Sequence, residues 1–224
     1  KMSNYQNDYV LNKALFSKID KVHNDRLGAN LDKHQLKLTE DVYIYFKRNG
    51  ASLSDDDKVK LRKIDADLSA LSPKFSNNVL SAQNKFELWI TNESDLEGLT
   101  DTSIDAAKVA AIKKGKEQEW LFTLQFPSYI PFLTYSAKRH LREKMLKAYG
   151  SLCNGGEYDN TQIVKDIVRL KHKRANLLGY DTFADYVLER RMAENSTNVY
   201  KLLDNLYDHS FEAASKELDE LKKF

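Results

Sequence analysis

Apolar residues recur at intervals of three and four along most of this chain, which is the spacing of one face of an α-helix. The longest stripe consists of Leu61, Ile64, Leu68, Leu71, Phe75, Val79, Ala82 and Phe86. Only 8 Gly and 3 Pro occur in 224 residues, so few positions interrupt the pattern. The periodicity therefore predicts a mainly α, multi-helix protein.

Start and stop signals separate the expected helices. Ser54 and Asp57 form a capping-box-like start of the long helix, and Gly50, Gly115 and Gly179 suit left-handed helix ends. Pro73 removes a backbone hydrogen bond at a cost of about 3 kcal/mol, which predicts a kink or a break in the long helix. The ranges predicted as helical are 8–27, 32–49, 54–86, 100–114, 134–149, 160–178, 182–190 and 197–224.

Two segments carry β-forming residues in partly alternating order, at about 86–91 and 119–126. We expect them to pair as a small β-ribbon, with Pro127 ending the second strand before a turn through Ser128 and Pro131. No fixed-period repeat or low-complexity linker divides the chain. Residues 1–224 are therefore predicted to form one helical region.

The charge balance limits the classes of partner. Lys and Arg number 35 against 33 Asp and Glu, so a net charge of +2 implies no global attraction to nucleic acid or to a membrane. No run approaches the roughly 20 apolar residues of a spanning helix. The single cysteine, Cys153, excludes an internal disulfide. The predicted location is the cytoplasm, with the periplasm left open.

A zinc peptidase helix would need two imidazoles one turn apart and a glutamate beside the first, and no H-E-x-x-H occurs here. The five histidines are His23, His34, His140, His172 and His209. Glu143 follows His140 by three residues, a spacing more typical of a surface hydrogen bond or ion pair than of a metal site. Cys153 has no histidine beside it in sequence to act as a base. The predicted catalytic, cofactor and metal residues are therefore none.

Three further motifs have ordinary structural explanations. The basic run Arg169–Arg174 is framed by apolar residues, which indicates the solvated side of an amphipathic helix, with nucleic-acid binding as the minority alternative. The acidic run Asp55–Asp57 lacks the glycine and distal glutamate of a calcium loop and is typical of a helix start. Gly155 and Gly156 lack the context of a phosphate-binding loop, which favours a flexible joint.

Several ordered strings resemble the peptidyl-dipeptidase and thimet oligopeptidase family of zinc metallopeptidases, in its non-catalytic N-terminal half. They are YFKRNGASLSDDDKVKLRKIDADLSALSPKFSNNVL from Tyr45, DLEGLTDTSIDAAKVAA from Asp95, LTYSAKRHLREKMLKAYGSL from Leu133 and the segment from Tyr158 to Leu206. One local departure is Thr100, where the family often has proline, which predicts a differently started helix. The resemblance covers most of the chain.

The resemblance implies a larger, two-lobed hydrolase in which one zinc ion, held by two His and a Glu, serves the proteolysis of short peptides. It places none of these ligands in this chain. Residues 1–224 are then a channel wall that restricts access by size, and the expected partners are short peptide substrates and the missing C-terminal catalytic region. The fragment alone is expected to be inactive, with no zinc, nucleic acid or membrane bound.

The two ends of the chain bear on the expectation of a fragment, and its aromatic residues bear on an alternative. The chain starts at Lys1 without a leader and stops at Phe224 inside an amphipathic run without a stop signal, which predicts a cut at each end. The alternative is a free-standing helical protein-interaction module without enzymatic activity, which would use aromatic residues on helical faces to hold a partner.

Overall fold

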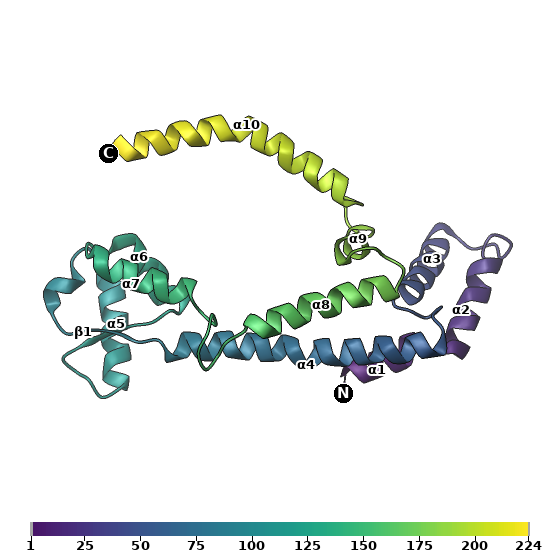
Figure 1. Ribbon diagram of the computed structural model, residues 1–224, viewed down its shortest axis with the longest axis horizontal. Helices are drawn as coiled ribbons and strands as arrows, with labels where there is room; N and C mark the ends of the chain where they lie inside the picture. The colour runs from purple at the N-terminus through teal and green to yellow at the C-terminus, as the bar shows by residue number, and fades with distance from the viewer. Residues whose placement is uncertain (1, 224) are drawn as a thin grey trace. The chain divides into compact units, whose positions relative to one another are not determined.

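The computed structural model describes residues 2–223, with side chains from residue 5 onward, so both predicted cuts, at Lys1 and Phe224, lie outside the described residues. The prediction of a mainly α chain with one small β-ribbon is confirmed (Figure 1). In chain order the described elements are α1 (Met2–Val10), α2 (Lys13–Asp25), α3 (Lys33–Arg48), α4 (Asp55–Lys85), β1 (Leu88–Ile90), the short 3-10 helix η1 (Glu93–Leu96), α5 (Asp101–Lys113), β2 (Trp120–Phe122), α6 (Phe126–Tyr135), α7 (Arg139–Gly150), α8 (Thr161–Leu177), α9 (Phe183–Leu188) and α10 (Ser196–Lys223).

The contacts group the chain into two compact units. Unit 1 comprises Lys1–Ser69 and Val168–Phe224, and unit 2 comprises Ala70–Ile167. The divisions fall inside α4 and inside α8, so each of these helices contributes residues to both units. Each unit has its own cluster of buried apolar side chains.

The core of unit 1 is small and aromatic. Its buried members are Val10, Leu11, Phe46, Ala51 and Leu61. Phe46 of α3 is 1% exposed, and its ring lies 6.5 Å from that of Phe16 on α2 and 5.1 Å from that of Tyr9 on α1. These contacts bring three N-terminal helices together on one phenylalanine.

The predicted single helix over 8–27 is wrong, because the structure has two helices, α1 and α2, with a break after Val10. The side chain of Asn12 accepts a hydrogen bond from the Leu15 amide at 2.9 Å, so Asn12 is the N-cap of α2. Leu11, beside the break, is buried in the core of unit 1. Capping and local burial together stabilise a turn that the apolar periodicity of the sequence conceals.

Of the kink or break predicted at Pro73, the break does not occur, and the kink stays a prediction. Pro73 lies inside α4, which is one helix from Asp55 to Lys85. Proline leaves the carbonyl four residues earlier without its helical partner, and here that residue is Ser69, which is exposed to solvent. Water can therefore hydrate the carbonyl, which lowers the cost of a proline within the helix.

The β-ribbon organises the core of unit 2. β1 and β2 are antiparallel, with Leu88 opposite Phe122 and Ile90 opposite Trp120. Both strands are shorter than predicted, and Pro127 lies in the first turn of α6 instead of ending a strand, which corrects the expected turn. Helices α5, α6 and α7 complete the core, in which Phe132 and Met145 are fully buried.

The glycine stops and the start of α5 follow the sequence signals. Gly115 and Gly179 have φ of +79° and +89° directly after α5 and α8, as predicted. α5 begins with Thr100 as its N-cap, whose side chain accepts a hydrogen bond from the Ser103 amide at 3.3 Å. That this start differs from the start of the helix in other family members stays a prediction.

Gly98 is the position at which a side chain is least compatible with the fold. Its φ is +86°, and an added Cβ would lie 2.3 Å from the carbonyl oxygen of Tyr135 and 2.9 Å from the amide nitrogen of Ala137. The neighbouring backbone is held in place, since the Ala137 amide donates to the carbonyl of Glu97 at 2.8 Å.

We therefore expect Gly98→Ala to lower the free energy of unfolding by at least about 2 kcal/mol, because strain at positive φ adds to a backbone clash. The matched control is Gly115→Ala, which has similar strain (φ +79°) but no heavy atom within 4 Å of the new Cβ and should cost about 1 kcal/mol. Urea denaturation of both variants measures the difference. Equal losses would contradict the predicted clash.

Candidate functional site

Metal-ligating side chains do not cluster in the part of the chain that the structure describes. Within residues 2–223 no group of three or more His, Cys, Asp or Glu side chains could hold a metal ion. His23 stacks on Tyr43 with ring centroids 3.8 Å apart, and His209 Nδ1 lies 2.7 Å from the carbonyl oxygen of Asn205 within α10. Both side chains thus have local structural contacts.

The acidic partner considered for His140 pairs elsewhere. Glu143 forms an ion pair with Lys147, one turn along α7, with 2.5 Å between Oε1 and Nζ. The hydrogen bond from Lys147 lowers the pKa of Glu143, so the carboxylate stays ionised at neutral pH. This is an ordinary exposed helix pair of low energetic weight.

The acidic run at the start of α4 is a helix start, as predicted. Asp57 receives a hydrogen bond from Ser54 Oγ at 2.9 Å, and its amide donates back to that oxygen at 3.2 Å. Lys60 Nζ lies 2.7 Å from Asp57 Oδ1. The hydrogen bonds from Lys60 and Ser54 lower the pKa of Asp57, which fits a capping carboxylate.

The basic run Arg169–Arg174 is not uniformly solvated, which corrects the interpretation from sequence. His172 and Lys173 are exposed, but Arg174 Nε lies 2.8 Å from Asp65 Oδ1, and the two side chains are only 15% and 17% exposed. Burial lowers the pKa of Arg174, but its interactions with the Asp65 carboxylate and with Tyr186 together raise the pKa by more, so the net shift is upward. Sequence gave no sign of this pair, because its members are 109 positions apart.

Side-chain hydrogen bonds hold the loop between α7 and α8, where a flexible joint is predicted at Gly155 and Gly156. Asp159 Oδ1 accepts from the Gly155 amide at 3.1 Å and from the Thr161 amide at 2.9 Å. Asn160 is 3% exposed, and its side chain donates to the carbonyl of Phe75 at 3.1 Å. These bonds fix both ends of the loop within unit 2.

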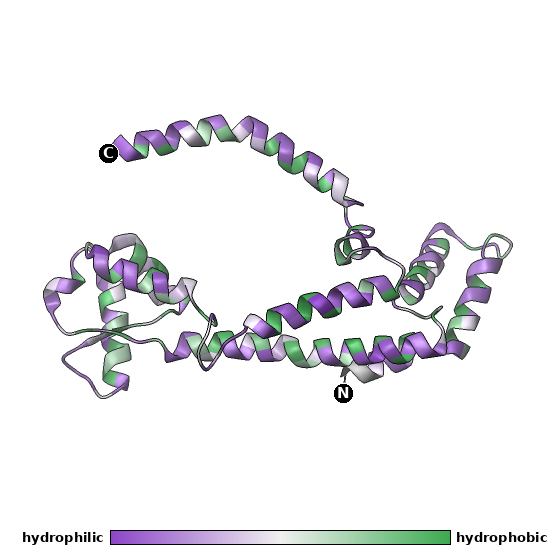
Figure 2. Ribbon diagram, in the orientation of Figure 1, coloured by the Kyte–Doolittle hydropathy of each residue, from purple (hydrophilic) through white to green (hydrophobic). Residues whose placement is uncertain are grey.

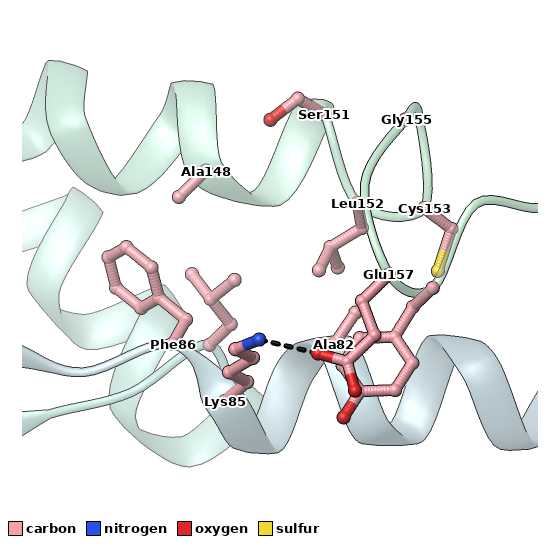
Figure 3. A pocket seen from close by; sticks show the side chains of 11 residues that line it. Ala82, Lys85, Phe86, Ala148, Ser151, Leu152, Cys153, Gly155 and Glu157 are labelled. Carbon is pink, nitrogen blue, oxygen red and sulfur yellow. Dashed lines mark hydrogen bonds and ion pairs between the residues drawn. The ribbon is translucent and has the colours of Figure 1, made fainter.

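Cys153 lines an open hollow of about 400 Å³ in unit 2 (Figure 3). The side chains around it come from the end of α4, from α7 and from the loop that follows α7, and the ion pair of Lys85 with Glu157 (2.6 Å) lies on its rim. Burial raises the pKa of the Cys153 thiol, and the Asp159 carboxylate adds to the shift. A thiol held protonated in this way is a poor nucleophile.

An uncovered apolar surface runs along α10. Its large apolar side chains follow helical spacing, and six of them lie on one face: Tyr200, Leu203, Tyr207, Phe211, Leu218 and Leu221. Each of the six is between 51% and 71% exposed. We call these six residues the α10 apolar face. Figure 2 shows apolar and polar residues alternating along this helix.

The opposite side of α10 is polar, with Lys201, Asp208, Glu212 and Lys216 among its residues. Within residues 2–223 no helix has the length and apolar character to cross a membrane. The amphipathic pattern of 197–224 was recognised in the sequence. Its exposure was not, because periodicity shows which residues share a face and not what covers that face.

Comparison with known proteins gives a consistent set of relatives. Residues 132–224 match the model of peptidase family M3. Oligopeptidase A of Haemophilus influenzae is 35% identical over 228 residues, which cover 100% of this chain and 33% of that protein. The probable cytosolic oligopeptidase A of Arabidopsis thaliana is 37% identical, over 79% of this chain and 26% of its own length. Dipeptidyl carboxypeptidase of Escherichia coli is 27% identical, over 95% and 31% respectively.

The chain thus spans about a third or less of the length of these relatives. The match is collinear with nearly all of this chain and includes α10, the helix with the uncovered apolar face. Most of each relative has no counterpart here.

The raised pKa predicts that Cys153 reacts slowly with an alkylating reagent. At about pH 8 an ordinary cysteine has a substantial thiolate fraction, whereas Cys153 should have less, so iodoacetamide should label it several-fold more slowly than it labels the unfolded chain in concentrated urea. Cys153→Ser gives the background, because the chain has one cysteine. A rate–pH profile shifted below that of the unfolded chain would contradict the expectation.

Proposed function

Because this chain belongs to peptidase family M3, we propose that it is a non-catalytic region of a longer zinc-dependent oligopeptidase that hydrolyses short peptides. The observation that carries the proposal is the match to oligopeptidase A along the whole chain but over only a third of that protein. A cytoplasmic location is part of the proposal and is supported by the name of the cytosolic relative.

The zinc ion of such an enzyme does not fit this chain. Structural or catalytic zinc needs three or four nitrogen, sulfur or carboxylate ligands about one point, and the described residues 2–223 offer no group of three. Glu143, Asp57 and Asp159 are each engaged by a lysine or by capping donors. The proposed place of the zinc ligands is therefore the remainder of the longer protein.

The proposed partner of this region is that remainder, and the contact surface is the α10 apolar face. Burying a Leu or Phe side chain stabilises a contact by about 1.5–3 kcal/mol, and six such residues are uncovered on one helix. A helix face of this composition suits an apolar groove or a second helix. Docking there would make α10 the junction with the catalytic region.

The proposed contribution of this region to catalysis is selection by size. A wall of packed helices beside a recessed metal centre admits short or unfolded peptides and excludes folded proteins. Whether dipeptides are removed from the C-terminus or internal bonds are cut would depend on groups around the metal, so the two named types of relative, oligopeptidase A and dipeptidyl carboxypeptidase, correspond to alternatives for the longer enzyme.

The alternative function is a free-standing helical interaction module, and the same α10 apolar face favours it. The two differ in what the gene encodes after residue 224. An open frame of several hundred codons with an H-E-x-x-H segment supports the peptidase, and a nearby stop codon supports the module.

We expect the purified 224-residue chain to bind no stoichiometric zinc and to cleave no short peptide, because the proposed ligands lie elsewhere. The product of the uninterrupted gene should contain about one zinc ion per chain and hydrolyse a short fluorogenic peptide, with loss of hydrolysis in a chelator. Elemental analysis and the peptide assay measure both. Zinc-dependent hydrolysis by the 224-residue chain would overturn the placement of the site.

Phe211→Ser tests the proposed docking of α10. Phe211 is 55% exposed in this chain, so the substitution should change the stability of the 224-residue chain little. In the longer protein, where the face is proposed to be covered, it should lower the free energy of unfolding by about 3 kcal/mol. Glu212→Ser, on the polar side, is the matched control and should have little effect in either protein. Thermal unfolding gives the comparison, and a small loss in both proteins for Phe211→Ser would contradict docking.

A further inference from the structure

Helix α9 is attached to unit 1 in an unusual way. None of its residues is fully buried, so it contributes nothing to the apolar core of the unit. Its two aromatic rings, those of Phe183 and Tyr186, instead face cationic side chains. Attachment by charge and ring contacts is directional, whereas apolar burial is not.

The contacts repeat at helical spacing on two helices. On α8, Lys171 and Arg174 are three residues apart, and on α9, Phe183 and Tyr186 are three residues apart. Lys171 Nζ lies 5.0 Å from the centroid of the Phe183 ring, and Arg174 Cζ lies 5.3 Å from that of Tyr186. Both are within the range of cation–π attraction.

A second guanidinium approaches Tyr186 from another helix. Arg48, the last residue of α3, has Cζ 4.7 Å from the Tyr186 ring centroid, and its side chain is only 13% exposed. It also donates to the carbonyl oxygen of Tyr186 and to the hydroxyl of Tyr180 at 3.1 Å. Tyr186 therefore has arginines from α3 and α8 against its ring.

Both arginines are fixed by carboxylates, which makes them rigid partners. Arg48 pairs with Glu189 at the end of α9, and Tyr180 donates to the same carboxylate. Arg174 pairs with Asp65 of α4, with both side chains largely buried. Arginine suits these positions, since its planar group can stack on a ring and bind a carboxylate at the same time.

The segment after α9 connects α9 to α10 by hydrogen-bonded turns, so the orientation of α9 determines the direction of α10. In these turns the Arg191 amide donates a hydrogen bond to the carbonyl oxygen of Leu188 at 2.8 Å, and the Glu194 amide donates one to the carbonyl oxygen of Arg191 at 3.0 Å. Asn195 then caps α10 by accepting from the Asn198 amide at 2.9 Å. α10 contacts α9 within unit 1.

We propose that Arg48, Lys171, Arg174, Phe183 and Tyr186 form a cation–aromatic clamp that positions α9 and thereby sets the direction in which α10 leaves unit 1. These are positioning residues, because the role that we propose for them acts through α9 and α10. The clamp itself is a property of unit 1. Its use, which is to direct α10 toward the catalytic region, rests on the proposed function. It also explains why part of the basic run Arg169–Arg174 faces the protein.

Distance measurement between two spin labels in the 224-residue chain tests the clamp without any assay of hydrolysis. The labels replace the exposed lysines Lys63 on α4 and Lys216 on α10, in a Cys153→Ser background. Tyr186→Ala removes the ring held by both arginines and should broaden the distance distribution, with the ratio of docked to undocked α9 falling about tenfold or more. Tyr186→Phe keeps the ring and should keep the narrow distribution.

Tyr200→Ala is the matched control, since it removes a tyrosine that is 65% exposed on α10 and outside the clamp. It should leave the distance distribution unchanged.

Arg48→Lys keeps the charge but loses the planar group, and should broaden the distance distribution less than Tyr186→Ala does. Circular dichroism checks that each variant is folded, and Arg48→Lys carries the test if Tyr186→Ala is not. An unchanged distribution in the folded variants, or equal broadening by Tyr186→Phe and Tyr186→Ala, overturns the clamp. Failure of the zinc and hydrolysis experiments would leave this result untouched.

Discussion

Burial of one apolar face per helix is the constraint on which both units depend. Unit 1 meets it with a small cluster around Phe46, and unit 2 with a larger one in which β1 and β2 provide a surface for α5, α6 and α7. The α10 apolar face is an exception to this constraint, because its six large apolar side chains belong to neither cluster and are exposed. Monomeric proteins rarely leave contiguous apolar surface of this kind without a binding role.

Where apolar burial is lacking, charge and aromatic contacts replace it. Tyr186 lies against Arg48 and Arg174, and each arginine is in turn neutralised by a carboxylate. Such contacts depend on angle and distance, so they define the orientation of a helix more sharply than the burial of apolar surface does. They are also individually weak, so several of them are needed to hold a short helix that has no fully buried residue.

Periodicity predicted most of the helices because apolar residues share one face of each, whether or not that face is covered, and capping residues predicted several of their ends, as at Ser54, Gly115 and Gly179. It failed where a short-range signal competed with the period. Asn12 caps a new helix inside an unbroken apolar pattern, and Pro127 begins α6 where a strand end was expected. Long-range pairs such as Arg174 with Asp65 leave no local trace. For the site, sequence could exclude the H-E-x-x-H pattern but could not show that the α10 apolar face is uncovered.

In the longer enzyme that we propose, burial of the α10 apolar face would make this chain and the catalytic region unfold as one cooperative protein. Six large side chains, each contributing about 1.5–3 kcal/mol on burial, sum to about 9–18 kcal/mol before the entropy of ordering is subtracted. That is comparable with the whole free energy of folding of a typical domain, about 5–15 kcal/mol. Even a fraction of it would couple the stability of the catalytic region to the helices described here. Substitutions far from any metal ligand could then reduce peptide hydrolysis by loosening that coupling, and not by altering the chemistry.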